Sequence, residues 1–154
     1  MKPGVFSQVY LHLVFSPKGR AACIREEIQD EVFRYISKTI TNKNHKSLNV
    51  NGMPDHVHIL VGLDTTVSVS DLVRDIKRSS SLFINERKLI GKRFQWQEGY
   101  GVFSYSRSQI PIISNYIDNQ KHHHQKRGFK DEYLELLQKF EIPFEEKFLF
   151  SFYE

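Results

Sequence analysis

The chain has 154 residues, of which 40% are hydrophobic and 26% are charged, and its formal net charge is +4. This length and composition predict one folded domain over residues 1–154 and exclude a disordered chain. The single cysteine, Cys23, excludes an intramolecular disulfide framework, and the N-terminal residues hold no apolar run long enough for a signal peptide or membrane span, so we expect a cytoplasmic protein.

Hydrophobic periodicity predicts the elements of the first half of the chain. Alternating apolar residues predict a strand over residues 5–15, and apolar residues at helical spacing predict a helix over 25–42. Two short strands follow, over 48–51 and 56–63. A second helix is predicted over 69–89, with one buried apolar stripe.

The second half begins with an aromatic, glycine-punctuated segment, residues 94–106, which predicts a strand or a bent pair of strands. A helix is predicted over 108–127 and a last helix over 131–140, on either side of Gly128. The order of elements predicts an α+β ferredoxin-like βαββαβ sandwich, with C-terminal helices added. The antiparallel sheet of such a sandwich has helices on one face, so we expect the other face to be free.

A pair of histidines marks the strand predicted over 56–63. Residues two apart in a strand point to the same side, so His56 and His58 share one face while Val57 and Ile59 share the other. The apolar pair belongs under the helices, so both imidazoles are expected on the uncovered face, where they can ligate one cation. The spacing alone is weak evidence, because about 0.3 His-x-His matches are expected by chance.

A tyrosine and a glutamine lie one turn apart on the helix predicted over 108–127. Tyr116 and Gln120 are four residues apart and so share a helix face. A tyrosine hydroxyl can attack a phosphodiester and form a covalent phosphotyrosine, which conserves the bond energy for rejoining. Gln120 offers an amide oxygen beside two imidazoles, a ligand set that suits Mn²⁺ and that Mg²⁺ can use with added waters. On spacing alone, a core role for Tyr116 is favoured.

Four segments together resemble the HUH-type single-tyrosine transposases of small bacterial insertion sequences, including their REP-associated relatives. The resemblance covers nearly the whole chain, to about Leu137. The segments are the strand end Leu13-Val14-Phe15, the block Met53-Pro54-Asp55-His56-Val57-His58-Ile59-Leu60, the block Phe94-Gln95-Trp96-Gln97-Glu98-Gly99-Tyr100-Gly101 and the helix segment Tyr116-Ile117-Asp118-Asn119-Gln120.

This resemblance implies a metal-dependent transposase that cleaves and rejoins single-stranded DNA at hairpin-marked element ends through a covalent 5′-phosphotyrosine. Tyr116 would be the nucleophile, and His56, His58 and Gln120 would hold Mg²⁺ or Mn²⁺, with no nucleotide cofactor. The resemblance also implies a bacterial, nucleoid-associated homodimer, in which the tyrosine helix of one subunit completes the active site of the other.

Basic side chains give a candidate DNA surface, in keeping with a pI near 9.1. Lysine and arginine near phosphates supply salt-dependent, sequence-neutral affinity. The three consecutive histidines of residues 122–124 are also a possible metal-binding group. We expect them to form a solvated helix end, and phosphate contact is the second interpretation. Aromatic residues within 94–106 either stack on unpaired bases or belong to the core. The expected phosphate contacts are Arg74, Lys77, Arg78 and Lys121.

Two other functions remain open. The same fold serves a non-catalytic module that binds hairpin DNA, such as a retired or domesticated transposase. It also serves a small metal-dependent hydrolase in which Tyr116 is structural. Covalent attachment to DNA separates the transposase from both alternatives, because a hydrolase releases its product without holding it.

Overall fold

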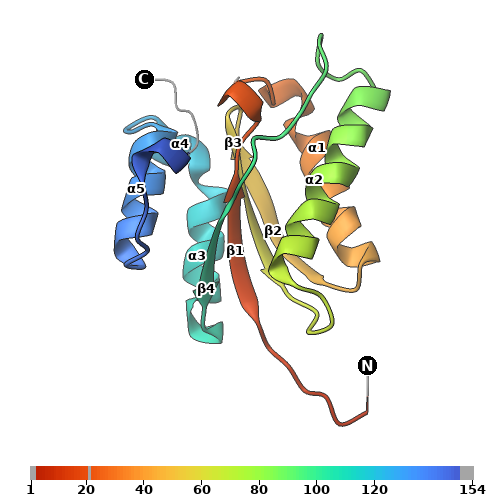
Figure 1. The fold of residues 1–154 in the computed structure, drawn as a ribbon, viewed down its shortest axis with the longest axis vertical. Coiled ribbons are helices and arrows are strands. Elements are labelled where there is room, and N and C mark those ends of the chain that lie inside the picture. Colours follow the sequence, from red (N-terminus) through yellow and green to blue (C-terminus); the bar gives the residue numbers. More distant parts are fainter. Residues whose placement is uncertain (1–2, 21, 150–154) are drawn as a thin grey trace.

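One sheet of four strands forms the centre of the fold, with neighbours in the order β2-β3-β1-β4 (Figure 1). All neighbouring strands run antiparallel. The computed structural model describes residues 3–20 and 22–149. This strand order, with a helix after β1 and another after β3, confirms the predicted ferredoxin-like βαββαβ sandwich. The strands are β1 (Tyr10–Phe15), β2 (Lys46–Met53), β3 (His56–Gly62) and β4 (Gly101–Tyr105).

Two long helices, α1 (Glu26–Asn42) and α2 (Val69–Glu86), cover one face of the sheet (Figure 1). Ser68 caps α2 by accepting a hydrogen bond from the Asp71 amide at 3.1 Å. No helix among the described residues has the length and apolar character that crossing a membrane requires. The core under α1 and α2 is built from both layers and includes Leu13, Phe15, Ile36, Ile40, Val57, Ile59, Leu72 and Ile76.

The opposite face of the sheet is covered as well, by three C-terminal helices (Figure 1). The expectation that this face stays free is therefore wrong. Leu60 of β3 points to this side and forms a second apolar cluster with Ile110, Ile113 and Ile117. An apolar strand residue gains from burial, which favours packing of the C-terminal helices here. These helices are α3 (Ile110–Asp118), α4 (Gln120–His124) and α5 (Phe129–Lys139).

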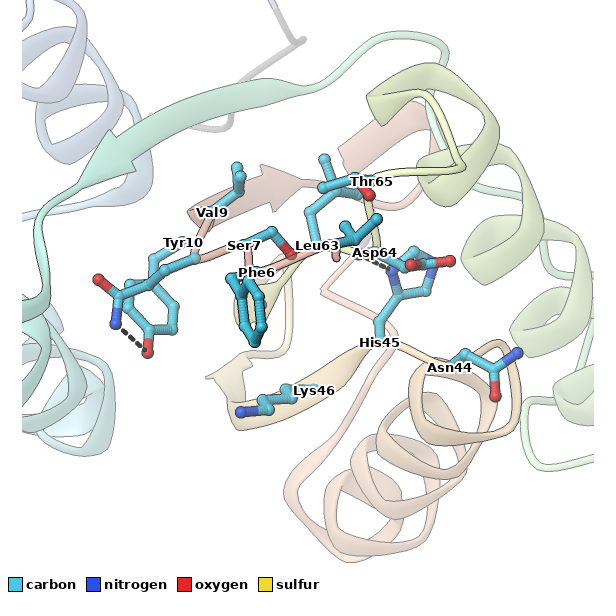
Figure 2. Close-up of a pocket in the computed structure, with 13 residues that line it drawn as sticks. Phe6, Ser7, Val9, Tyr10, Asn44, His45, Lys46, Leu63, Asp64 and Thr65 are labelled. Carbon is cyan, nitrogen blue, oxygen red and sulfur yellow. Dashed lines mark hydrogen bonds between the residues drawn. The ribbon is translucent and has the colours of Figure 1, made fainter. Parts of the chain in front are cut away.

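The N-terminal segment does not extend β1 as far as predicted. The strand begins at Tyr10, and Phe6 is 86% exposed. Residues 5–10 line a pocket of about 810 Å³ together with residues 44–46 and 62–65 (Figure 2). This pocket lies at the far end of β3 from the two histidines, and none of the predicted site residues lines it.

The predicted helix over 108–127 is interrupted. A single 3₁₀ turn precedes α3, and Asn119 then leaves the helical conformation, with φ −95° and ψ 24°, before α4 begins. The segment 94–106 contributes only β4 as a regular strand. Phe94, Trp96 and Phe103 are buried, so these three side chains belong to the core and are not available to stack on bases.

A bulge in β2 sets which of its side chains face the C-terminal helices. Ser47 and Asn49 pair with consecutive residues of β3, so Leu48 is an extra residue in the ladder. After the bulge, Asn49 and Asn51 lie on the same face of the sheet as His58, with which Asn51 is paired.

Candidate metal and tyrosine site

Both predicted histidines lie at the start of β3, on the face opposite α1 and α2. The alternation of the strand places them there, as predicted. His56 and His58 are each 0% exposed, because the C-terminal helices cover this face. The prediction that both imidazoles emerge on an open surface is therefore wrong, and the candidate site is an interior one.

A polar partner holds the Nδ1 atom of each histidine. His56 Nδ1 is 2.7 Å from Asp55 Oδ1, and His58 Nδ1 is 2.7 Å from His12 Nε2. Outer partners of this kind fix the orientation and tautomer of a ligating imidazole. With both Nδ1 atoms engaged, the Nε2 atoms of His56 and His58 are left to face the interior of the site.

His12 is a neighbour that the sequence analysis missed. It lies on β1, is fully buried, and its ring stacks on His58 with centroids 4.9 Å apart. Burial, with the nearby His58 adding to it, lowers the pKa of His12, so its imidazole is neutral at neutral pH. If His58 donates its Nδ1 proton to His12 Nε2, the His58 Nε2 lone pair is free to bind a cation.

Tyr116 lies on α3 and points into the same space. Its ring meets the His58 ring edge-on, with centroids 5.9 Å apart, and its hydroxyl donates a hydrogen bond to Glu132. Burial and the negative charge of Glu132 raise the pKa of Tyr116 well above its usual range, so the hydroxyl carries its proton in this arrangement. The side chain is half-buried and reaches the site from its own chain.

Gln120 follows the break between α3 and α4 and is 0% exposed. Its Oε1 lies 3.1 Å from His56 Nε2 and 3.1 Å from His124 Nε2, and its Nε2 donates to Glu132 Oε2 at 3.1 Å. All four residues predicted for metal binding and nucleophilic attack are therefore brought together within one chain. The homodimer with shared sites stays a prediction.

Glu132 is the second residue that the sequence analysis missed, and it lies at the centre of the site. It is 1% exposed, and its Oε1 lies 3.0 Å from His58 Nε2 and 3.3 Å from His56 Nε2. Ligand atoms of His56, His58 and Glu132 all lie within 4.8 Å of one another, a grouping able to hold a metal ion. A sequence signal existed, because Glu132 shares the apolar face of α5 with Phe129 and Tyr133.

The charges of the site favour an ionised carboxylate. Burial raises the pKa of Glu132, but the imidazole of His58 and hydrogen bonds from the histidines outweigh burial and hold that pKa far below its usual range. Burial likewise lowers the pKa of His56, but hydrogen bonds to Asp55 and Glu132 outweigh it and raise the pKa to about 9. Without a metal, His56 is therefore a cation between two carboxylates at neutral pH.

The histidine run after Gln120 is only partly solvated. His124 has a side chain that is 7% exposed, and its Nε2 lies 3.2 Å from Glu132 Oε1. The predicted solvated helix end is therefore wrong for His124, because α4 restarts at Gln120 and places residues four apart on its inner face. His122 is exposed and His123 is half-buried, so they fit that prediction better.

Two asparagines of β2 fasten the tyrosine helix to the sheet. Asn49 Nδ2 lies 3.1 Å from the Ser114 carbonyl oxygen, 3.1 Å from Ser114 Oγ and 2.9 Å from Asp118 Oδ1. Asn51 donates to the carbonyl of Ile117 at 2.9 Å. That carbonyl belongs to the last turn of α3, where helix carbonyls need partners from outside the helix.

The predicted phosphate contacts lie in different surroundings. Arg74 pairs with two aspartates of α2, and Lys121 pairs with Glu26. Lys77 donates to the carbonyls of residues 97 and 99 at 2.8 and 2.7 Å, while Arg78 is exposed. The three α2 residues lie in the helix layer across the sheet from Tyr116, and DNA contact by all four stays a prediction.

Sequence comparison identifies relatives of this chain. A family described as IS200-like transposases matches residues 5–120. The chain is 30% identical over 115 residues to the transposase of insertion sequence IS200 from Salmonella typhimurium, covering 71% of this chain and 74% of that protein. It is 24% identical over 123 residues to the ISDra2 transposase TnpA of Deinococcus radiodurans, covering 76% and 87%.

Solved structures share the fold. A crystal structure of a candidate transposase from Deinococcus radiodurans matches with a TM-score of 0.63 at 22% identity, covering 78% of this chain and 96% of that one. A REP-associated tyrosine transposase bound to a REP hairpin matches with a TM-score of 0.55 at 15% identity, covering 80% and 74%. The family match spans β1 to Gln120, including the histidine pair and Tyr116, and the chain therefore belongs to the family of IS200-like transposases.

Proposed function

We propose that this transposase cleaves and rejoins single-stranded DNA at hairpin-marked element ends, with Tyr116 as the nucleophile. One observation carries the proposal: the Tyr116 hydroxyl, the Nε2 atoms of His56 and His58, and the Gln120 amide converge around one buried carboxylate. A core tyrosine needs no such set of polar groups, so the convergence argues against a purely structural role for Tyr116.

The proposed step is an exchange at phosphorus. The Tyr116 oxygen attacks the scissile phosphate, and the bond between phosphorus and the 3′ oxygen breaks. The DNA 5′ end stays on Tyr116 as a phosphotyrosine, and the departing 3′ end gains a proton in place of the one that the phenol loses. Attack of another 3′ hydroxyl on the phosphotyrosine reverses the step and joins the strands.

The residues around Tyr116 fit a divalent cation. His56 and His58 would hold it through Nε2, since a polar partner already engages each Nδ1, and Gln120 would hold it through its amide oxygen. Imidazole, amide and water ligands suit Mn²⁺, and Mg²⁺ can use them when waters and phosphate oxygens complete its shell. When bound, such an ion polarises the scissile phosphate and stabilises the charge of the transition state.

The proposed substrate and assembly follow from the relatives. The REP-associated structural relative is bound to a REP hairpin, which supports a DNA hairpin as the partner of this chain. We include a nucleoid-associated homodimer with shared active sites in the proposal. A mixture of a Tyr116→Phe chain with a His58→Ala chain tests whether active sites are shared. Covalent adduct should form in the mixture only if α3 of one subunit enters the site of the other, because only that arrangement brings an intact His58 and an intact Tyr116 together.

The proposal is tested by incubating the protein with single-stranded hairpin DNA from the ends of its element, with Mn²⁺ or Mg²⁺, and running a denaturing gel. We expect a metal-dependent covalent protein–DNA band that is lost in Tyr116→Phe. The matched control is Tyr105→Phe, because Tyr105 is another partly buried tyrosine, on β4, and its ring packs against Phe140.

The other outcomes identify the alternatives. Tight hairpin binding without a covalent band in either metal would make the chain a DNA-binding module. Free cleaved product that persists in Tyr116→Phe would make it a hydrolase. Loss of the band in Tyr105→Phe as well would mean that the assay reports folding and not the nucleophile.

A further inference from the structure

Glu132 makes more polar contacts than any other side chain described in the site. Its Oε1 lies within 3.3 Å of three imidazole Nε2 atoms, those of His56, His58 and His124. Its Oε2 accepts hydrogen bonds from the Tyr116 hydroxyl and from Gln120 Nε2. One carboxylate therefore touches every group to which the proposed function gives a role.

The spacing of these atoms matches neighbouring ligands on one cation. Bonds of roughly 2.1 Å to an octahedral ion place adjacent ligand atoms roughly 3 Å apart. The Glu132 Oε1 atom is 3.0 Å from His58 Nε2 and 3.3 Å from His56 Nε2, and Gln120 Oε1 is 3.1 Å from His56 Nε2. The donor atoms are therefore already spaced as neighbouring ligands of one ion would be.

The charge of the site also calls for a carboxylate ligand. Two neutral imidazoles and an amide leave the charge of a divalent cation uncompensated, and these three side chains are each 0% exposed. Burying an uncompensated charge is costly. Glu132 is the one carboxylate in the cation-binding grouping found among the described residues, and hard cations such as Mn²⁺ and Mg²⁺ prefer oxygen ligands.

We infer that Glu132 is a direct ligand of the metal through Oε1 while Oε2 holds the Tyr116 hydroxyl beside that metal. The inference rests on the proposed function in assuming that the site binds a divalent cation. It makes α5 a part of the active site, and α5 begins at Phe129, beyond the residues 5–120 that match the family. In the competing interpretation, Glu132 is purely structural: it only neutralises the charge of His56 and does not bind the metal.

The test is Mn²⁺ binding without DNA, measured by calorimetry on the wild-type chain and on Glu132→Gln. The substitution keeps the size of the side chain and its ability to hydrogen-bond, but removes the charge. We expect the Mn²⁺ dissociation constant of Glu132→Gln to rise at least tenfold. Asp131→Asn is the matched control, because Asp131 is the exposed preceding residue of the same helix, and its Mn²⁺ affinity should equal that of the wild type.

A second measurement needs no variant and decides the question if Glu132→Gln does not fold. Wild-type crystals soaked in Mn²⁺ should show an anomalous peak within bonding distance of a Glu132 oxygen and of His56 and His58 Nε2. A peak that excludes Glu132, an unchanged affinity in Glu132→Gln, or no Mn²⁺ binding by the wild type would each overturn the inference.

The failure of this inference is distinguishable from the failure of the proposed function. A covalent DNA band from the wild type, with Mn²⁺ affinity unchanged in Glu132→Gln, overturns the inference alone. Mn²⁺ binding that depends on Glu132, without a covalent band, overturns the proposed function and leaves the ligand assignment standing.

Discussion

The asparagines of β2 should control how well Tyr116 is placed. Asn49 and Asn51 direct their amides at α3. The amide NH2 group of Asn49 has two protons, so its contacts count as two hydrogen bonds, and Asn51 adds one more. At about 1 kcal/mol for each of these hydrogen bonds, including the solvent-exposed one to the Asp118 carboxylate, the double variant Asn49→Ala/Asn51→Ala should lose about 3 kcal/mol of α3 docking. That energy corresponds to a docking equilibrium weakened by roughly 100-fold.

The assay is the rate of covalent adduct formation at saturating hairpin DNA and metal. We expect the double variant to form the adduct ten- to a hundredfold more slowly (on the order of the loss that a misplacement of about 1 Å causes). DNA affinity should change little, because neither asparagine is an expected phosphate contact.

A matched control comes from the other face of the same strand. The Oγ atom of Ser47 lies 2.6 Å from Oγ of Ser37 on α1, so Ser47→Ala also removes a hydrogen bond between β2 and a helix. Its adduct rate should equal that of the wild type. An adduct rate for Asn49→Ala/Asn51→Ala within twofold of the wild type, with the fold intact, would refute the positioning role.

Three further predictions concern packing, pH and the basic surface. Gly101→Ala would place a Cβ 2.6 Å from the Tyr133 hydroxyl and so force α5 to shift away from β4. The free energy of unfolding, measured with denaturant, should fall by roughly 1–3 kcal/mol. Below about pH 9, Mn²⁺ affinity should increase about tenfold for each unit of rising pH, and above about pH 9 it should level off. The reason is that the His56 proton must leave before the ion binds, and the pKa of His56 is about 9. Calorimetry across a pH series measures this dependence. Lys77→Met should lower stability by about 2 kcal/mol, since its ammonium donates to two carbonyls, whereas Arg78→Ala should leave stability unchanged and weaken salt-dependent binding of single-stranded DNA.

Local periodicity accounts for the part of the site that the sequence predicts. The two-residue period of a strand places His56 and His58 on one face, and the four-residue spacing of Tyr116 and Gln120 places them on one side of their segment. The order of strands and helices, with the family resemblance, was enough for the sheet topology. These features depend on residues close together in the chain.

The remaining site groups arise from contacts between distant segments. His12 reaches His58 across the β1–β3 pair, and Glu132 reaches the histidines from a helix 74 residues beyond His58. The bulge at Leu48 reverses the phase of β2 and brings Asn49 to the site, and simple alternation does not reveal it. The covered face was missed for the same reason, because Leu60 alone does not indicate which helices bury it.

The most direct test of the central claim is to identify the residue that carries the DNA. The covalent adduct formed with hairpin DNA and Mn²⁺ is digested with nuclease and protease, and its peptides are sequenced by mass spectrometry. We predict a nucleotide 5′-phosphate on the peptide that contains Tyr116 and on no other peptide. A modification on a different residue would contradict the assignment of Tyr116 as the nucleophile. An adduct that forms equally well without a divalent metal would contradict the proposed metal dependence.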